Sequence, residues 1–266
     1  MLGVSKASTL VRWVENCGGA LVSVVFPADC RLCKQLLTRA SRIPICSDCL
    51  AAFQKVSAEH CVGCGQPWLV AGETQGREQI CRDCRAEKYA FDAARSYGIY
   101  EGALARAIVL MKYEKIEPLG TWFGKRLDEV VRMEGKRLEA DIVVPVPLHR
   151  QREKERGYNQ VDLFGKSLAR RLGLAYRPVL LKRAKPRPEK HLLRREERWE
   201  AVRRAFAMEN GGRVDNSRIL LLDDVMTTGA TLDACTRVLR EAGAKSVLAV
   251  TIARAPRPAR PADDSV

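Results

Sequence analysis

The chain has 266 residues, of which 46% are hydrophobic and 29% are charged, and its formal net charge is +14. This composition suits a globular protein with one sizeable core and a small second module, and every apolar run is shorter than the roughly 20 residues of a membrane span. A positive charge this large favours anionic partners, such as nucleic acid, phosphorylated metabolites or anionic lipid, without choosing among them.

Residues 1–27 are moderately apolar, but Arg12, Glu15 and Asn16 interrupt them. The cleanest apolar stretch, Gly18 to Pro27, lacks the charged segment that directly precedes the apolar part of a signal peptide. We therefore expect an N-terminal amphipathic helix in residues 1–27, no cleaved signal, no membrane span and a cytoplasmic protein.

Eight of the ten cysteines form four Cys-x-x-Cys pairs, with 12 residues between the first two pairs and 16 between the last two. The pairs are Cys30/Cys33, Cys46/Cys49, Cys61/Cys64 and Cys81/Cys84. Two such turns supply the four thiolates of a closed tetrahedral site, which is the geometry of structural zinc. We predict two structural zinc ions in a double zinc ribbon over residues 28–86. Disulfides are unexpected in a reducing compartment, whereas an iron–sulfur cluster remains compatible with the spacing.

From about residue 90, helical and strand-like patterns alternate. Helical apolar spacing occurs in residues 101–113, 119–133, 158–172 and 231–242, and short apolar runs predict strands at 141–145, 176–181, 218–223 and 246–252. This alternation predicts a parallel sheet with helices on both faces, in a domain over residues 90–254 followed by a flexible tail at 255–266. Ligands of such sheets bind at the carboxyl ends of the strands. Cys235 lies within a predicted helix, where we expect a small buried apolar residue.

The most informative segment is ILLLDDVMTTGATL at residues 219–232. A strand ends at Asp223 and Asp224, and a loop containing Gly229 leads into a helix. Gly229 permits a tight turn, and the N–H groups at the start of the helix favour a phosphate. The two carboxylates would repel a phosphate, but they suit the hydroxyls of a ribose and a bound magnesium ion. An ordinary strand with a helix capped by Thr228 or Thr231 is the simpler interpretation, but it does not account for the two acids.

This segment resembles the phosphoribosyl diphosphate signature of type I phosphoribosyltransferases. Together with VPVPLHRQREKERGYNQ at residues 144–160 and the four Cys-x-x-Cys pairs, it makes the chain similar to the ComF family of competence-associated proteins, including its ComFC and GntX-like members. The resemblance extends from about residue 20 to residue 254. It implies an α/β fold with a type I phosphoribosyltransferase-like parallel sheet flanked by helices, preceded by a small Cys₄ double zinc ribbon.

The resemblance also implies roles for individual residues. Asp223 and Asp224 would contact the ribose hydroxyls and magnesium. The ligand's 5-phosphate would lie against Thr227, Thr228, Gly229, Ala230 and Thr231, and the pyrophosphate loop would comprise Pro145, Val146 and Pro147. Arg156 and Asn159 would complete the binding site, and the candidate catalytic residues are Asp223, Asp224 and Arg156. The forked guanidinium groups of Arg150, Arg152 and Arg156 suit a diphosphate, although a solvated charged turn with Glu153 and Glu155 is the alternative.

Residues 182–204 contain ten basic and four acidic residues. The resemblance implies a mobile loop here that closes over the reacting centre. The same segment suits a nucleic-acid backbone, and the candidates for that contact are Arg183, Lys190, Arg194, Arg195 and Arg198. Family members commonly carry Gln and Asn at two positions that align with Lys190 and Ala201 in this chain. The resemblance therefore implies ligand binding more directly than turnover.

We expect a ComF-like protein that binds phosphoribosyl diphosphate with magnesium and transfers the phosphoribosyl group to an acceptor that the sequence does not identify. The family's association with natural transformation implies a role in DNA uptake or in the use of external DNA. One alternative is a non-catalytic accessory protein that binds single-stranded DNA and docks a DNA-uptake helicase or another competence protein. A second alternative is a regulator that senses phosphoribosyl diphosphate.

Overall fold

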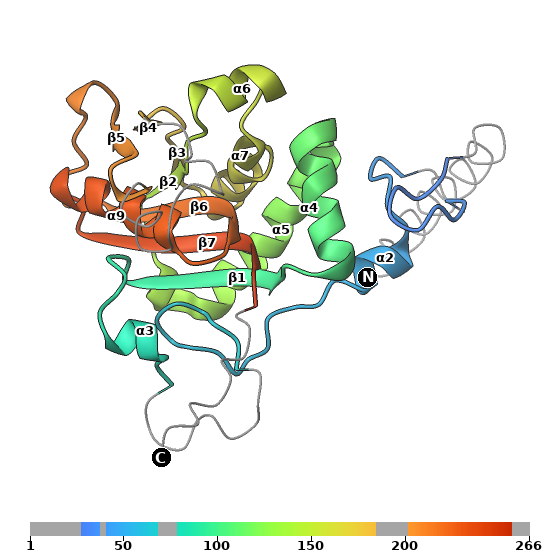
Figure 1. Ribbon diagram of the computed structural model, residues 1–266, viewed down its shortest axis with the longest axis horizontal. Helices are drawn as coiled ribbons and strands as arrows, with labels where there is room; N and C mark the ends of the chain where they lie inside the picture. Colours follow the sequence, from blue (N-terminus) through green and yellow to red (C-terminus); the bar gives the residue numbers. More distant parts are fainter. Residues whose placement is uncertain (1–27, 38–40, 69–78, 185–201, 257–266) are drawn as a thin grey trace, which may run out of the picture.

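The computed structural model describes residues 28–37, 41–68, 79–184 and 202–256. Its centre is a five-stranded sheet in the order β1-β7-β6-β2-β3, and all neighbouring strands are parallel. The strands are β1 (Ala93–Ile99), β2 (Ile142–Pro145), β3 (Ala175–Tyr176), β6 (Arg218–Met226) and β7 (Ser246–Arg254). A two-stranded antiparallel ladder of β4 (Leu181–Arg183) and β5 (Phe206–Met208) stands beside the sheet (Figure 1). The expected parallel α/β fold is confirmed.

Helices cover both faces of the sheet, and β6 buries apolar side chains against the helices on each face. Leu220 and Leu222 belong to the core under α4, α5 and α7, whereas Ile219 and Leu221 belong to the core under α9. Alternate residues of a strand point to opposite faces, so an unbroken apolar run requires cover on both. The long helices are α4 (Gly102–Glu114), α5 (Glu117–Glu134), α7 (Gln160–Leu172) and α9 (Ala230–Glu241). They match the four predicted helices within a few residues.

Short helices lie in the connections. They are α2 (Ser47–Ala51), α3 (Arg82–Arg85), α6 (Arg150–Arg156) and the 3₁₀ turns η1 (Gly135–Leu138) and η2 (Glu209–Gly211). Among the described helices, none has both the length and the apolar character that crossing a membrane demands. The expected N-terminal helix of residues 1–27 and the tail from residue 257 lie outside the described residues.

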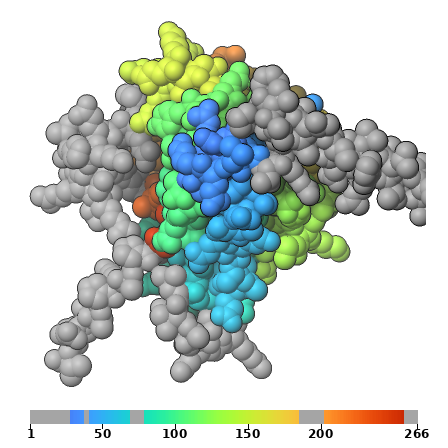
Figure 2. All heavy atoms as spheres, turned by 90° about the vertical axis from the view of Figure 1, so that its right-hand side faces the viewer, coloured from blue at the N-terminus to red at the C-terminus, as the bar shows by residue number. Residues whose placement is uncertain are grey.

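The two cysteine clusters pack against different parts of the sheet domain. Residues around the first cluster join the core that contains α4 and α5, and Figure 2 shows this blue segment lying on the green of α4. The second cluster, whose Cys61, Cys64 and Cys81 are buried, joins the core under α9 on the other face. Each cluster therefore has its own neighbours within the sheet domain.

The prediction of one strand over residues 176–181 is wrong. Tyr176 ends β3 in the main sheet and Leu181 begins β4 in the separate ladder, with Pro178 between them. Proline lacks an N–H group for a strand ladder, which explains the break. Strand β6 is longer than predicted and runs through both aspartates to Met226, because β7 pairs with it as far as Arg254.

Candidate functional site

Polar side chains from several elements meet in a cleft of about 310 Å³ at the carboxyl ends of β2 and β6. The cleft is lined by these predicted site residues: Val146, Pro147, Arg156, Asp223, Asp224, Thr227 and Thr231. Arg152, Gln160 and Arg183 line it as well. Parallel sheets place their ligand sites at this edge, so the position agrees with the fold.

Five other predicted site residues do not line the cleft. Pro145 ends β2, and Thr228, Gly229 and Ala230 lie at the start of α9. Asn159 is buried, where its Nδ2 donates to the carbonyl of Val146 at 3.0 Å and its Oδ1 accepts from Val161 N at 3.1 Å. Asn159 therefore holds the turn after β2 and caps α7.

Asp224 is engaged by residues from two helices. Nζ of Lys112, near the end of α4, lies 3.0 Å from its Oδ1. The amide of Gln160, at the start of α7, donates to its Oδ2. Only 6% of Asp224 is exposed. A buried carboxylate needs such partners because leaving it without them is costly. Lys112 and Gln160 therefore hold the side chain of Asp224, the second acid of the motif.

The loop after β6 presents Thr227 and Thr231 to the cleft and turns at Gly229. Gly229 is the N-cap of α9 with a φ of 83°, a left-handed conformation that favours glycine. Thr228 Oγ1 accepts from Ala230 N at 3.4 Å, but neither Thr228 nor Thr231 is the N-cap. Because α9 starts at the cleft, the positive end of its dipole borders it, which suits an anion. Asp223 Oδ1 accepts from Asp224 N at 2.8 Å.

The arginine-rich segment that could have been a solvated turn is the short helix α6. Residues four apart share a helix face, so Arg152 and Arg156 both line the cleft, whereas Arg150 lines a neighbouring cavity. Arg156 Nη1 donates to Gln160 Oε1 at 2.8 Å, which extends the network around Asp224. His149 caps this helix and also lines the cleft.

Arg183 is the one nucleic-acid candidate that the structure describes. It lines the cleft, and its guanidinium carbon lies 5.0 Å from the ring centroid of Phe206 on the paired strand. The other candidates, Lys190, Arg194, Arg195 and Arg198, lie outside the described residues, as does Ala201. The pairing of Arg183 with Phe206 places the two ends of this basic segment side by side near the cleft.

Lys112 is a site residue that no motif in the sequence indicates. The helical pattern of residues 101–113 places Lys112 beside the buried Met111, but nothing in that pattern indicates a partner on β6. A lysine next to the apolar face of a helix, in the last turn before its end, was the available signal. Identifying Asp224 as its partner requires the tertiary structure.

The two cysteine clusters fit the predicted metal. In each cluster the four Sγ atoms lie within 4.8 Å of one another. Four sulfurs at about 2.3 Å from a tetrahedral zinc ion are roughly 3.8 Å apart, and Cys33–Cys46 and Cys64–Cys81 have Sγ separations of 3.7 and 3.6 Å. Backbone N–H groups donate to Cys30 Sγ at 3.3 Å and to Cys61 Sγ at 3.2 Å, which favours thiolates. With four sulfur ligands, such an ion is structural.

Comparisons with known proteins agree with this architecture. A double zinc ribbon domain matches residues 21–87, and a phosphoribosyl transferase domain matches residues 163–266. The chain is 28% identical to competence protein F of Haemophilus influenzae, over 79% of this chain and 90% of that protein. It is 29% identical to competence protein ComFC of Streptococcus pneumoniae, over 82% and 91% of the two chains.

A third relative is the DNA utilization protein YhgH of Salmonella typhi, which is 28% identical over 83% of this chain and 94% of that protein. Each of these three similarities spans about four fifths of this chain, which is more than the sheet domain alone. The chain therefore resembles the ComF family, with a double zinc ribbon domain followed by a phosphoribosyl transferase domain.

Proposed function

We propose that this protein binds phosphoribosyl diphosphate with magnesium in the cleft at the ends of β2 and β6, and that it is a phosphoribosyltransferase. The observation that carries the proposal is the meeting of three kinds of group in one cleft. Acidic Asp223 and Asp224, the threonine loop at the start of α9, and the arginine face of α6 all border it. A ribose, a phosphate and a diphosphate need these three chemistries respectively.

Each group has a distinct role in the proposal. Asp223 and Asp224 accept hydrogen bonds from the ribose hydroxyls and hold magnesium, which neutralises charge on the diphosphate when it is bound. The hydroxyl groups of Thr227 and Thr231 donate hydrogen bonds to the 5-phosphate beside the start of α9. Arg152 and Arg156 bind the diphosphate that leaves during transfer. Asn159 holds the turn at Val146 and Pro147, which borders the cleft, through its hydrogen bond to the carbonyl of Val146.

The relatives named as competence and DNA utilization proteins support a place for this chemistry in the uptake or use of external DNA. The wider charge balance supports the same setting, because a formal net charge of +14 attracts polyanions. In this proposal the protein acts in the cytoplasm and transfers the phosphoribosyl group to a nucleophile, with release of the diphosphate.

A second candidate function is binding of single-stranded DNA without chemistry. The observation that favours it is the position of Arg183, which lines the cleft and lies at the start of the basic segment, residues 182–204. Titration of a labelled oligonucleotide at several salt concentrations tests it, because backbone contacts release counterions and make affinity fall steeply with salt. No binding at low salt, or affinity that does not change with salt, would reject this candidate.

Calorimetric titration with phosphoribosyl diphosphate, with and without magnesium, tests the first proposal. We expect magnesium-dependent binding to the wild type and a loss of at least about tenfold in Asp223→Asn, since a hydrogen bond to a charged group contributes about 1.5–3 kcal/mol. Asp128→Asn is the matched control, because Asp128 pairs with Arg132 on α5, away from the cleft. Equal affinity of the wild type and Asp223→Asn would overturn the proposal.

A further inference from the structure

Tyr89, in the segment between α3 and β1, lies directly against the loop that follows β6. Its hydroxyl is 3.1 Å from the carbonyl oxygen of Thr228 and 3.4 Å from Oδ2 of Asp83. A Cβ atom on Gly229 would come within 2.8 Å of Cε1 of Tyr89. The tyrosine ring therefore fills the space behind Gly229, and its hydroxyl bonds the backbone of the same loop.

The neighbouring residue ties the same segment to the first turn of α9. Ala90 N donates to Oδ1 of Asp233 at 2.8 Å, and Asp233 is fully buried. The other carboxylate oxygen accepts from Arg237 Nε at 3.0 Å. Asp233 N in turn donates to the carbonyl of Gly229 at 2.9 Å. Residues 89 and 90 thus contact the loop from one side and the helix that follows it.

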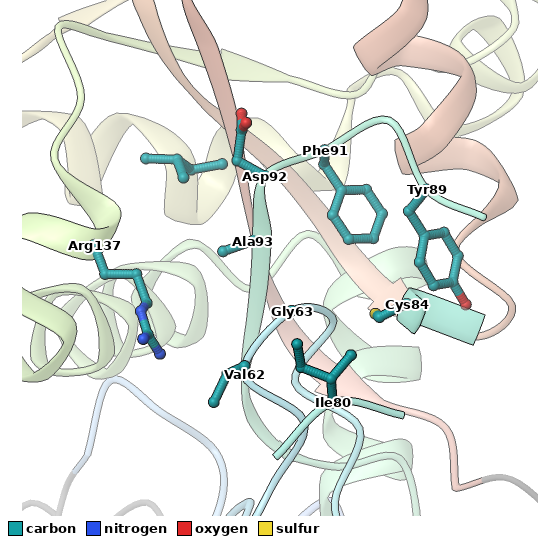
Figure 3. Close-up of a pocket in the computed structure, with 10 residues that line it drawn as sticks. Val62, Gly63, Ile80, Cys84, Tyr89, Phe91, Asp92, Ala93 and Arg137 are labelled. Carbon is teal, nitrogen blue, oxygen red and sulfur yellow. The ribbon is translucent and has the colours of Figure 1, made fainter. Parts of the chain in front are cut away.

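The second cysteine cluster fixes the position of Tyr89. The single hydroxyl hydrogen of Tyr89 is shared between the carbonyl of Thr228 and Oδ2 of Asp83, and Asp83 stands between Cys81 and Cys84 of the second cluster. Lys88 N donates to the carbonyl of Asp83 at 3.1 Å, and Lys88 Nζ lies 3.1 Å from its Oδ2. Tyr89 also stacks on the buried Phe91, with ring centroids 4.8 Å apart. Figure 3 shows Cys84, Tyr89 and Phe91 grouped on one side of a pocket, with Arg137 on the other.

We propose that the second Cys₄ cluster, through Asp83 and Tyr89, sets the position of the loop at residues 227–231. Tyr89 is in this view a positioning residue for the 5-phosphate site, and the metal of the second cluster is needed for the loop to keep its shape. The contacts of Tyr89 and Ala90 with residues 228 and 233 support the effect of the cluster on the loop. The role of Tyr89 in positioning the 5-phosphate site rests on the proposed function.

The first cluster provides an internal comparison because its neighbours are different. Cys30 belongs to the core shared with α4 and α5, and Arg31 Nη2 lies 3.5 Å from Glu114 Oε2 at the end of α4. Loss of metal from the first cluster should therefore loosen α4 rather than the loop. The two clusters bind metal with the same ligands, so a difference between them reports on their neighbours.

A tyrosine substitution tests the contact without removing metal. We expect Tyr89→Phe to keep both zinc ions and to speed hydrogen exchange at residues 226–232 in the ligand-free protein, because local opening becomes easier. Its affinity for ribose 5-phosphate, measured without magnesium, should fall roughly three- to tenfold, as loss of one hydrogen bond implies. Tyr176→Phe is the matched control, since its hydroxyl bonds Asp162 on α7.

Metal removal from each cluster tests the second step. We expect Cys84→Ser and Cys33→Ser each to lose one zinc ion, counted by atomic emission. Only Cys84→Ser should speed exchange at residues 226–232. Equal exchange in the two cysteine variants, or exchange in Tyr89→Phe that matches the wild type, would overturn the inference.

The two proposals fail in different ways. If the wild type binds neither ribose 5-phosphate nor phosphoribosyl diphosphate while the exchange pattern holds, the proposed function is wrong and the link from the cluster to the loop stands. If the wild type binds both ligands and Tyr89→Phe changes neither exchange nor affinity, the link is wrong and the proposed function stands.

Discussion

Lys112 Nζ lies 3.0 Å from Oδ1 of Asp224, so that a lysine from α4 neutralises one of the two adjacent acids at the end of β6. The pair joins a helix on one face of the sheet to the strand that carries the binding motif. Under the proposed function, a magnesium–diphosphate ligand would meet one carboxylate already in an ion pair. Loss of this ion pair should therefore change both the free energy of unfolding and the free energy of ligand binding.

We predict that Lys112→Met lowers the free energy of unfolding of the ligand-free protein by about 3 kcal/mol, because it leaves a buried carboxylate without its cation. Magnesium with phosphoribosyl diphosphate should restore much of the loss, since the metal replaces the missing charge. Thermal unfolding with and without ligand measures both effects. Lys166→Met, at an exposed position of α7, is the control and should change neither. A Lys112→Met protein as stable as the wild type would contradict the prediction.

Gly229→Ala should weaken binding of phosphoribosyl diphosphate by more than about tenfold. Alanine at a φ of 83° is strained, and its Cβ would also meet Tyr89. Gly173→Ala isolates the first effect, because Gly173 has a φ of 70° but nothing within 4 Å of the added atom. We expect both variants to lose about 1 kcal/mol of stability from the backbone alone. Only Gly229→Ala should lose affinity in a calorimetric titration, and equal losses of affinity would count against the contact with Tyr89.

Arg156→Ala should reduce the affinity for phosphoribosyl diphosphate by about 10- to 100-fold, whereas Arg150→Ala should leave it within about twofold. Both residues lie on α6, but only Arg156 lines the cleft. The affinity of each variant for ribose 5-phosphate, which lacks the diphosphate, separates loss of a diphosphate contact from general damage. A parallel loss for both ligands would contradict the assignment of Arg156 to the diphosphate.

Cys235 should resist thiol reagents in the folded protein at pH 8. Burial raises the pKa of its thiol well above the usual value, and the negative charge of Asp223 raises it further. The reactive thiolate is therefore scarce and inaccessible. Mass spectrometry after maleimide labelling should find Cys235 modified only in denaturant, whereas chelation of zinc should expose the eight clustered cysteines first. Labelling of Cys235 before chelation would contradict this prediction.

Much of the fold could be predicted because local signals agreed with the tertiary structure. The apolar run of β6 with its acids, and the four Cys-x-x-Cys pairs, each indicate a structure on their own. Strand β1 was missed because AARSYGI is not an apolar run, although the structure buries all seven residues. Arg95 is accommodated there by Glu134 at 2.8 Å, and Ser96 by the hydroxyl of Thr251 at 2.7 Å. Such partners come from distant segments, so no local pattern indicates them.

The candidate site shows the same division. Asp223, Thr227 and Thr231 follow from the motif and reach the cleft, because a strand and the helix after it fix their positions. The helix α6 was not predicted, since its sequence RQREKER has no apolar face. The roles of Lys112 and Tyr89 were not predictable either, because each depends on a contact between segments more than one hundred residues apart.

The most direct test of the proposed function is a crystal structure of the protein with phosphoribosyl diphosphate and magnesium. We predict electron density for the ligand in the cleft, with its 5-phosphate against residues 227–231, its ribose beside Asp223 and its diphosphate toward Arg156. Density for the ligand at another place, or an empty cleft in crystals grown at saturating ligand, would contradict the account.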